Sequence, residues 1–292
     1  MNSHFNKGLL LTSLGSFWWG FIGVIYFEYV AFIGHIELVV HRCLWTAVML
    51  IFTTSFLSKW RIFFEEIKDK KKVFALLISG FLIFVNWSIW IYAVASERII
   101  DASFGYFIMP IISVLLGYIF FKEKLNNKRI FSILLVFISI IIMILFNLKS
   151  LPWVGLIVAL SWAFYNLVRK KIIIDTDIGL LIESLFIFPF ALIAFYLITK
   201  NGFNDFNFQN PGLSLLLLLA GPMTVIPLFL YVRGVEIIGL GPTGMIFYIT
   251  PTFQFILGYF YYGEDFSIVK FGSFIIIWIA VIIYLKDLYE TN

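Results

Sequence analysis

The sequence has little charge and almost no cysteine. Asp, Glu, Lys and Arg make up 13% of the 292 residues, whereas soluble domains carry roughly 25%. Cys43 is the single cysteine, which excludes a disulfide within the chain and a cysteine-rich metal site. The sequence also lacks the HExxH, GxSxG and P-loop motifs. We therefore predict no enzyme, no catalytic residues, no metal and no cofactor, and the net charge of +4 does not indicate a nucleic-acid partner.

Apolar side chains fill most of the chain. They make up 62% of the residues, and the mean hydropathy is +1.00. The apolar runs are long enough to cross a hydrocarbon core of roughly 30 Å as helices, surrounded by membrane lipid. We predict an all-α integral membrane protein with ten spans, at residues 8–27, 36–57, 73–95, 102–121, 130–147, 153–168, 179–199, 213–232, 241–262 and 267–285.

Basic residues between the spans predict the orientation. If the N-terminus is cytoplasmic, the basic segments at 59–72, 122–129 and 169–171 all fall on the cytoplasmic side. Lys and Arg are enriched in cytoplasmic loops of membrane proteins. We therefore expect both termini in the cytoplasm and the chain in a bacterial cytoplasmic membrane.

An internal repeat relates the fourth span to the ninth. YFIMPIISVLLGYIFFKE (106–123) aligns without gaps to FYITPTFQFILGYFYYGE (247–264), so that Pro110 pairs with Pro251 and Glu123 pairs with Glu264. The two segments lie five spans apart, so the second is inverted relative to the first. This predicts two inverted five-helix repeats, residues 1–147 and 148–292, as in secondary transporters with a midplane substrate site. Pro110 and Pro251 are candidate hinges, and static kinks are the alternative.

Several stretches together resemble a known family. They are ELVVHRCLW (37–45), NWSIWIYAV (86–94), LPWVGLIVALSWAFYNLVRKK (151–171) and the segments at 102–123 and 248–264. In these stretches the chain resembles the RarD-type branch of the EamA family, within the drug/metabolite transporter superfamily. The resemblance implies a ten-helix inverted-repeat permease, with relatives linked to export of chloramphenicol-like compounds or metabolites. In the first span, Gly23 and the ending Tyr26-Phe27-Glu28 stand where the family pattern has a proline and a closing lysine.

Polar residues in the second span form the first group of candidate site residues. Glu37, His41 and Trp45 share one helical stripe, and Arg42 lies about 100° around from His41. Glu37 is placed to pair with His41 or Arg42. We predict that Arg42, His41 and Trp45 bind substrate and that Glu37 and His41 take part in proton coupling, because imidazoles titrate near neutral pH. The alternative is a polar cluster that locks helices together near the outer surface.

A second group lies in the sixth span. Trp162, Tyr165, Asn166 and Arg169 fall at i, i+3, i+4 and i+7, on one narrow face. We predict that Trp162, Tyr165 and Asn166 line a substrate cavity, with an interfacial aromatic belt as the alternative. Arg169 begins an Arg-Lys-Lys run, so we expect it to be a cytoplasmic anchor.

Isolated residues in the other spans complete the candidate site. For each of them, the alternative role is to form a hydrogen bond with a neighbouring helix or to pack against it. For Glu183 that alternative is a pair with Arg169 or a loop cation. The candidates are Asn86, Trp90, Tyr106, Tyr248 and Gln254 for substrate binding and Glu183 for proton coupling.

These features predict a secondary transporter that moves a small organic metabolite or amphipathic drug-like solute by alternating access. The aromatic content favours an amphipathic solute, and the cationic residues within the spans favour one that bears a carboxylate. Proton coupling and a homodimer remain open. Two other classes are weighed against the transporter: a lipid-modifying membrane enzyme using Glu37 and His41, and a structural or sensory subunit that tolerates alanine at Arg42 and Trp162.

Overall fold

Helices form the whole regular structure of the described chain. The computed structural model describes residues 3–95, 99–147, 153–261 and 268–291. The ten passes are α1–η1–α2 (Ser3–Phe17, Trp18–Ile22, Gly23–Tyr29), α3 (His35–Phe56), α5 (Lys70–Ala95), α6 (Ile99–Phe121), α7 (Asn127–Asn147), α8 (Trp153–Lys171), α9 (Thr176–Lys200), α10–α11 (Pro211–Leu218, Ala220–Ile238), α12–α13 (Leu240–Ile246, Ile249–Phe260) and α14 (Ile268–Thr291). The short helices η2 (Ala31–Ile33) and α4 (Trp60–Glu66) lie between passes.

The ten predicted spans are confirmed. Seven of the described passes are long and apolar enough to cross a membrane, judged by length and composition alone. With α6, α8 and α12–α13, the described chain has ten passes. Helices are the natural choice here because every backbone polar group is satisfied within its own segment. Some helices run beyond the apolar stretch, as in α14, which continues past the predicted end at residue 285 to Thr291.

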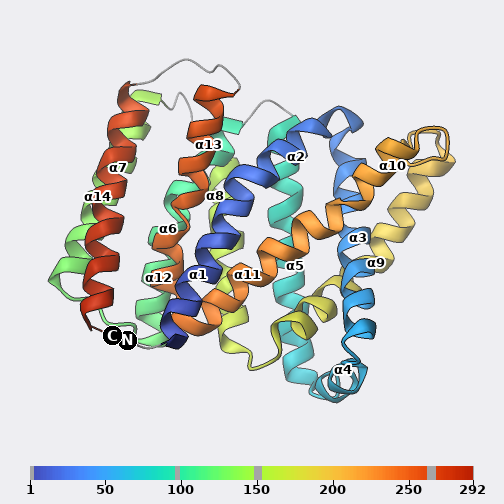
Figure 1. The fold of residues 1–292 in the computed structure, drawn as a ribbon, viewed down its shortest axis with the longest axis horizontal. Helices are drawn as coiled ribbons and strands as arrows, with labels where there is room; N and C mark the ends of the chain where they lie inside the picture. The colour runs from blue at the N-terminus through green and yellow to red at the C-terminus, as the bar shows by residue number, and fades with distance from the viewer. Residues whose placement is uncertain (1–2, 96–98, 148–152, 262–267, 292) are drawn as a thin grey trace.

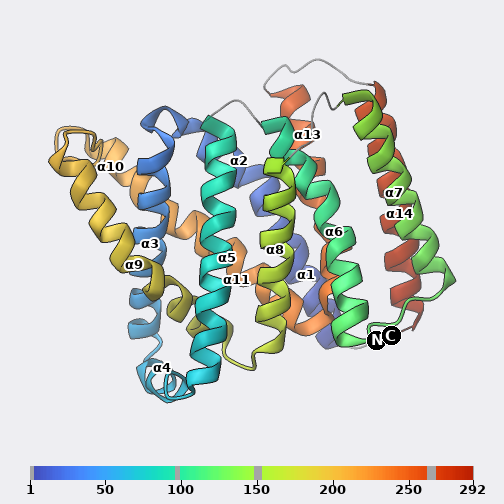
Figure 2. The same ribbon diagram turned by 180° about the vertical axis from the view of Figure 1, so that it is seen from behind.

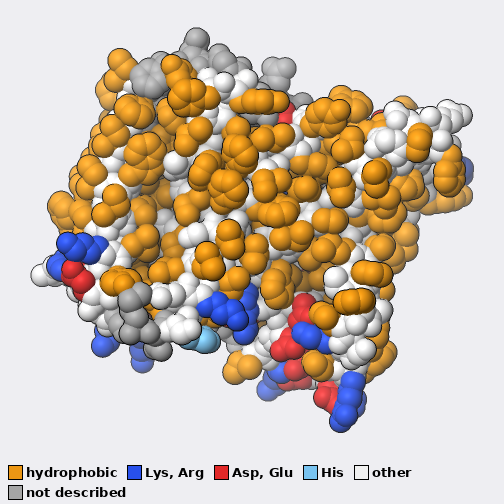
Figure 3. Space-filling view, viewed as in Figure 1, with side chains coloured by type: hydrophobic (Ala, Val, Ile, Leu, Met, Phe, Trp, Pro, Cys, Tyr) orange, Lys and Arg blue, Asp and Glu red, His pale blue; other side chains and the backbone are white. Residues whose placement is uncertain are grey.

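Both termini lie at the same end of the molecule, together with α4 (Figure 1). The view from behind shows α5 and α8 between α3 on one side and α6 on the other (Figure 2). Hydrophobic side chains cover most of the face in Figure 3, and charged side chains gather toward its lower edge. Phe131, Phe137 and Leu145 of α7 are among the exposed apolar side chains. Such a broad apolar surface suits a lipid environment.

Residues related by the internal repeat touch each other at the centre of the fold. The Tyr248 hydroxyl donates to the Phe107 carbonyl oxygen at 2.8 Å. The rings of Tyr106 and Phe247 lie 5.7 Å apart between centroids. Both pairs join a residue to its own equivalent in the alignment of 106–123 with 247–264. A residue meets its own equivalent only near a two-fold axis, so the axis relating the two inverted repeats passes between α6 and the α12–α13 junction.

Two of the passes are interrupted beside this axis. The first pass turns π-helical at Trp18–Ile22, and the ninth breaks between α12 and α13. Pro110 lies inside α6, whereas Pro251 lies in the first turn of α13. A first-turn proline costs no helical hydrogen bond, so the break precedes Pro251 and is not a kink at that residue. The hinge role of both prolines stays a prediction.

The terminal carboxylate of the first repeat segment holds the start of α12. Glu123 accepts hydrogen bonds from the amides of Leu240 and Gly241, each at 2.8 Å. Gly239 has φ +92 and leaves no room for a Cβ atom beside the Glu123 carboxylate. A carboxylate stabilises a helix N-terminus through its unpaired amides. Glu123 therefore links the two halves at the end where the termini lie; its repeat partner Glu264 is outside the described residues.

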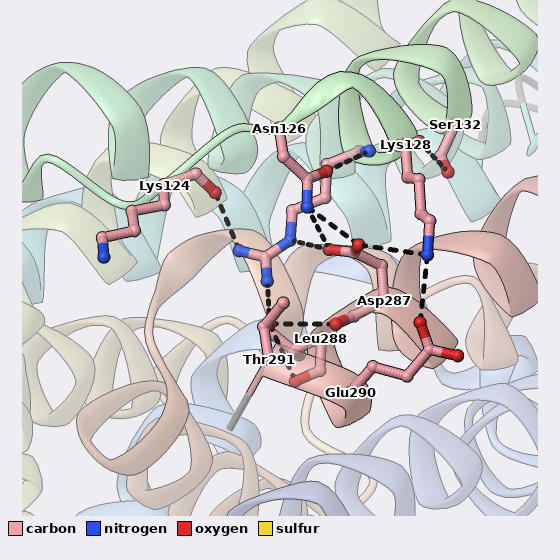
Figure 4. Close-up of polar contacts among 9 residues, drawn as sticks. Lys124, Asn126, Lys128, Ser132, Asp287, Leu288, Glu290 and Thr291 are labelled. Atoms are coloured by element: carbon pink, nitrogen blue, oxygen red, sulfur yellow. Dashed lines mark hydrogen bonds and ion pairs between the residues drawn. The ribbon is translucent and has the colours of Figure 1, made fainter.

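A buried ion pair ties α7 to α14 (Figure 4). Asp287 accepts from Arg129 Nε at 2.8 Å and from Asn126 Nδ2 at 2.8 and 2.7 Å. Arg129 also donates to the Lys124 carbonyl oxygen and the Thr291 hydroxyl, both at 2.7 Å. The pair fastens the ends of two helices that are far apart in the sequence.

We expect Asp287→Ala to destabilise the protein strongly. The Asp287 side chain is 3% exposed, and its removal strands the mostly buried Arg129 guanidinium, at a cost of about 3 kcal/mol or more. The matched control is Glu65→Ala, which removes the exposed Arg61–Glu65 pair of α4 and is expected to cost below about 1 kcal/mol. Thermal unfolding in detergent measures both, and equal shifts would contradict the expectation.

Candidate solute-binding cavity

A cavity lies between the two halves, beside the repeat axis. Its empty space, part of which is open to solvent, amounts to about 540 Å³. Both halves contribute to its walls. The lining residues are Trp19, Gly23, Phe27, Arg42, Asn86, Trp87, Trp90, Tyr106, Trp162, Phe247, Thr250 and Gln254.

Arg42 brings a buried positive charge to this cavity. The residue is 5% exposed. Its Nε donates to the Thr224 hydroxyl at 3.1 Å, and its guanidinium lies 4.8 Å from the Phe27 ring centroid and 4.7 Å from that of Trp87. Over the described part of the chain, no carboxylate forms an ion pair with Arg42, and no hydrogen bond is made by its two terminal amino groups. The guanidinium is thus held by one hydroxyl and two rings, with a forked pair of donors left for a ligand.

Aromatic rings in mutual contact form an apolar part of the cavity lining. Trp162 meets Trp19 edge-on, with ring centroids 5.0 Å apart. Phe247 lies 6.2 Å from Trp162 and 5.7 Å from Tyr106. Rings in this arrangement offer flat, weakly polar surfaces to an aromatic or aliphatic body. The cavity is therefore amphipathic, with one cation and an extended apolar wall.

Polar side chains on the cavity wall also connect helices. Asn86 donates from Nδ2 to the Val158 carbonyl oxygen at 2.9 Å and to the Ser161 hydroxyl at 3.1 Å. Thr250 donates to the Ser16 carbonyl oxygen at 2.8 Å. The helix-bonding alternative for Asn86 is thus observed together with its position on the cavity. Gln254 lines the cavity as well.

The structure separates Arg42 from the other polar residues of α3. His41 is fully buried and lies outside the cavity, with Nε2 3.3 Å from the Glu37 carboxylate and Nδ1 accepting from Trp45 Nε1 at 3.0 Å. Phe195 and Phe206 pack against the His41 ring. The Trp45 indole can only donate, so Nδ1 is the accepting nitrogen and Nε2 is the one that faces Glu37. Glu37 therefore pairs with His41, and neither lies beside Arg42 in the cavity.

Three further candidates are buried beside the cavity without lining it. Tyr165 stacks on Trp162 at 5.5 Å between centroids. Asn166 donates to the Trp162 carbonyl oxygen of its own helix at 2.9 Å. Tyr248 is bonded to Phe107 across the repeat axis. Of the predicted stripe on α8, only Trp162 reaches the cavity.

Arg169 is not a cytoplasmic anchor, which corrects the sequence-based expectation. It is 1% exposed, and its guanidinium lies 3.6 Å from Glu183 Oε1 and 3.6 Å from Glu236 Oε1. Gly179 makes this possible, because a Cβ atom there would overlap the guanidinium. The two acids come from α9 and α11. The residues next to Arg169 in the sequence therefore do not indicate that these acids surround it.

Glu183 lies at the centre of this buried cluster. It accepts from the Ser79 hydroxyl at 2.5 Å and the Tyr165 hydroxyl at 3.2 Å, in addition to its pair with Arg169. The pairing alternative for Glu183 is thus observed. Since Tyr165 also stacks on the cavity residue Trp162, the cluster is connected to the cavity through two rings.

Six lining residues were missed by the reading of the sequence. Three of them, Trp19, Gly23 and Phe27, fall at i, i+4 and i+8 on the first pass. That spacing places them on one face, which is a signal that could have identified them. The other three, Trp87, Phe247 and Thr250, are adjacent to or share a span with predicted residues and carry no separate signal.

Comparisons with known proteins agree with this architecture. The family model described as EamA-like transporter family matches residues 6–145 and again residues 150–286. Protein RarD of Escherichia coli K12 is 33% identical over 98% of this chain and 96% of its own length. An uncharacterized transporter of Bacillus subtilis 168, YojE, is 33% identical over 95% of this chain and 93% of its own length. A chloramphenicol-sensitive protein RarD of Pseudomonas aeruginosa is 23% identical over 85% of this chain and 83% of its own length.

A solved crystal structure shares the fold with a TM-score of 0.70 at 11% sequence identity, covering 96% of this chain and 97% of the other. The likeness extends over all the passes described above. The two family matches and the near full-length relatives cover nearly the whole chain as well. The chain belongs to the EamA-like transporter family, is of the RarD type, and is a multi-pass membrane transporter.

Proposed function

We propose that the chain is a secondary carrier that moves a small organic metabolite or an amphipathic drug-like solute by alternating access. The observation that supports this most directly is the cavity between the inverted halves, where the buried Arg42 guanidinium has no carboxylate partner among the described residues. Inverted-repeat carriers bind substrate between their halves. A buried charge is costly without a partner, and a solute would supply one.

The position of the cavity at the repeat axis fits alternating access. Tyr106 and Phe247 line the cavity and also contact each other as repeat equivalents. In inverted-repeat carriers, alternating access is largely a rocking of one half against the other around the substrate site. A solute bound there keeps its contacts while access changes from one side of the membrane to the other.

We further propose that the carrier lies in the bacterial cytoplasmic membrane with both termini in the cytoplasm. The support is the gathering of basic side chains at the end that holds the termini and α4 (Figures 1 and 3). Positive charge is retained on the cytoplasmic side during insertion. Accessibility labelling of single cysteines placed in α4 would test this orientation.

An enzymatic activity is not part of the proposal. The Glu37–His41 pair that a lipid-modifying enzyme would use is enclosed by Trp45, Phe195 and Phe206. A general base needs hydrogen-bond reach to its substrate, and both ring nitrogens of His41 are already engaged.

The function is tested by ligand binding and counterflow with purified protein. A panel of organic acids, amino acids, amines and chloramphenicol is screened for thermal stabilisation, because a ligand that binds the folded state raises Tm by mass action. Chloramphenicol is included because one relative is named for sensitivity to it. Each hit is then assayed for counterflow in proteoliposomes. A binding hit without counterflow would favour a sensory subunit over a carrier.

Proton coupling is proposed at Glu183, with Glu183→Gln as its test. The carboxylate is buried, contacts Tyr165, and through that ring is linked to cavity residue Trp162. Glutamine keeps the shape and removes the titration. We expect transport down a solute gradient within about threefold of the unchanged protein, while stimulation by a pH gradient is lost. His41→Gln is the comparison, because both ring nitrogens of His41 are engaged by Glu37 and Trp45. Stimulation that survives in Glu183→Gln and disappears in His41→Gln would move coupling to α3.

A further inference from the structure

The described residues that line the cavity are mostly uncharged. Among the twelve lining residues that the structure describes, Arg42 is the single one with a formal charge at neutral pH. The remaining residues contribute aromatic rings, two amides, the hydroxyls of Thr250 and Tyr106, and a glycine. The described lining therefore carries one net positive charge in surroundings that are mostly apolar.

Two buried acids, Glu37 and Glu183, are committed elsewhere. Glu37 lies on the same helix as Arg42, but its carboxylate binds His41 and the amide of Asp205. Glu183 is held by Arg169, Ser79 and Tyr165. The charge of Arg42 is thus not neutralised by either of these groups, and the two rings that flank it give only partial compensation.

We propose that the cavity selects organic monocarboxylates, with the carboxylate on Arg42 and an apolar body against Trp162, Tyr106 and Phe247. This inference rests on the proposed carrier function and specifies its substrate class. A monocarboxylate brings the cavity to zero net charge and satisfies the forked donors that the guanidinium presents. No other simple charge class does both.

Each competing class leaves a charge without a partner. A dicarboxylate or a phosphate dianion has a second negative charge, and the described lining residues include no second cation. An amino acid has an ammonium group, and the same described residues include no carboxylate for it. A cation is repelled by Arg42, and a neutral ester leaves Arg42 uncompensated. An unpaired charge is strongly disfavoured in a site of low polarity, so we expect the discrimination between these classes to be large.

The test uses five compounds that share one phenylalkyl body and differ in charge. They are 3-phenylpropionate, its methyl ester, phenylalanine, phenylsuccinate and phenethylamine. Dissociation constants are obtained from the concentration dependence of Tm and checked by competition in counterflow. We expect 3-phenylpropionate to bind at least 10-fold more tightly than each of the other four.

Two variants show whether Arg42 is the source of the preference. In Arg42→Gln the acid and its ester should bind with a ratio near one, because the charge that distinguishes them is gone. In Arg61→Gln, which alters an exposed arginine of α4, the ratio should be unchanged. Retention of the preference in Arg42→Gln would overturn the assignment.

The outcomes separate this inference from the carrier function. If phenylalanine, phenylsuccinate, phenethylamine or the ester matches the monocarboxylate, or if a solute found by the wider panel is not a monoanion, the inference fails and the carrier stands. A monoanionic solute from the wider panel that depends on Arg42 supports it. Absence of both binding and counterflow for every compound would overturn the inference and the proposed function together.

Discussion

Arg42→Ala is expected to weaken solute binding and slow counterflow at limiting solute by roughly 100-fold. Two charge-assisted hydrogen bonds from the guanidinium to a bound carboxylate contribute about 3 kcal/mol together, and each 1.4 kcal/mol is about tenfold. The guanidinium is available for this role because its only hydrogen bond within the described chain reaches Thr224 through Nε. Counterflow in proteoliposomes and the ligand-induced change in Tm measure the two effects.

The fold should survive this substitution. Arg42 is buried without an ion pair, so its removal leaves no stranded acid and the melting temperature without ligand should change little. Arg42→Lys serves as the matched variant, because lysine keeps the charge and loses the planar fork. We expect an intermediate loss for Arg42→Lys. Unchanged counterflow in Arg42→Ala, with the protein folded, would assign Arg42 to helix packing and leave Trp162 as the first residue to test.

Arg169→Ala is expected to have the largest effect on stability. Arg169 is the cation paired with the buried Glu183 carboxylate, whereas Glu236 keeps a second partner in Arg233 at 2.8 Å. Removal of the guanidinium therefore strands Glu183, at a cost of about 3 to 5 kcal/mol. For a chain of this size such a cost lowers Tm by about 10 °C. Thermal unfolding in detergent measures the shift.

The double variant Arg169→Ala/Glu183→Gln tests the cause. When the stranded charge is also removed, most of the lost stability should return, which gives a strongly non-additive mutant cycle. Additive effects of the two substitutions would show that Arg169 acts through packing against Gly179 and not through its charge. Lys171→Ala, at the end of the same Arg-Lys-Lys run, is a control that removes a neighbouring cation outside the cluster.

Reading the sequence identified about half of the cavity. Six of the predicted residues line the cavity, and each is a polar or large aromatic residue inside an apolar span. They are Arg42, Asn86, Trp90, Tyr106, Trp162 and Gln254. Such residues are costly in lipid, so they turn toward protein or a cavity wherever the fold allows. That rule predicts that such residues face the interior of the protein. It does not predict whether each one faces the cavity or a neighbouring helix.

The stripe on α3 shows the limit of that rule. Glu37, His41 and Trp45 share a face and form one hydrogen-bonded set, as their spacing implies. Their neighbour Arg42 lies on a different face, which the fold turns toward α5 and the first pass. Helical periodicity gives the angle between residues on one helix. It gives no information on which neighbouring helix covers each face.

The sequence by itself determined the ten spans, the inverted repeat and the family, because apolar length, residue spacing and motif order are properties of the chain. Only the tertiary structure decided that Arg42 lines the cavity while Glu37 and His41 do not. It also decided that Arg169 is buried between Glu183 and Glu236, and that Tyr106 contacts Phe247 at the repeat axis. Those contacts join residues from different helices. Their geometry depends on how each helix is rotated and which helix lies beside it, and packing among all ten passes sets both.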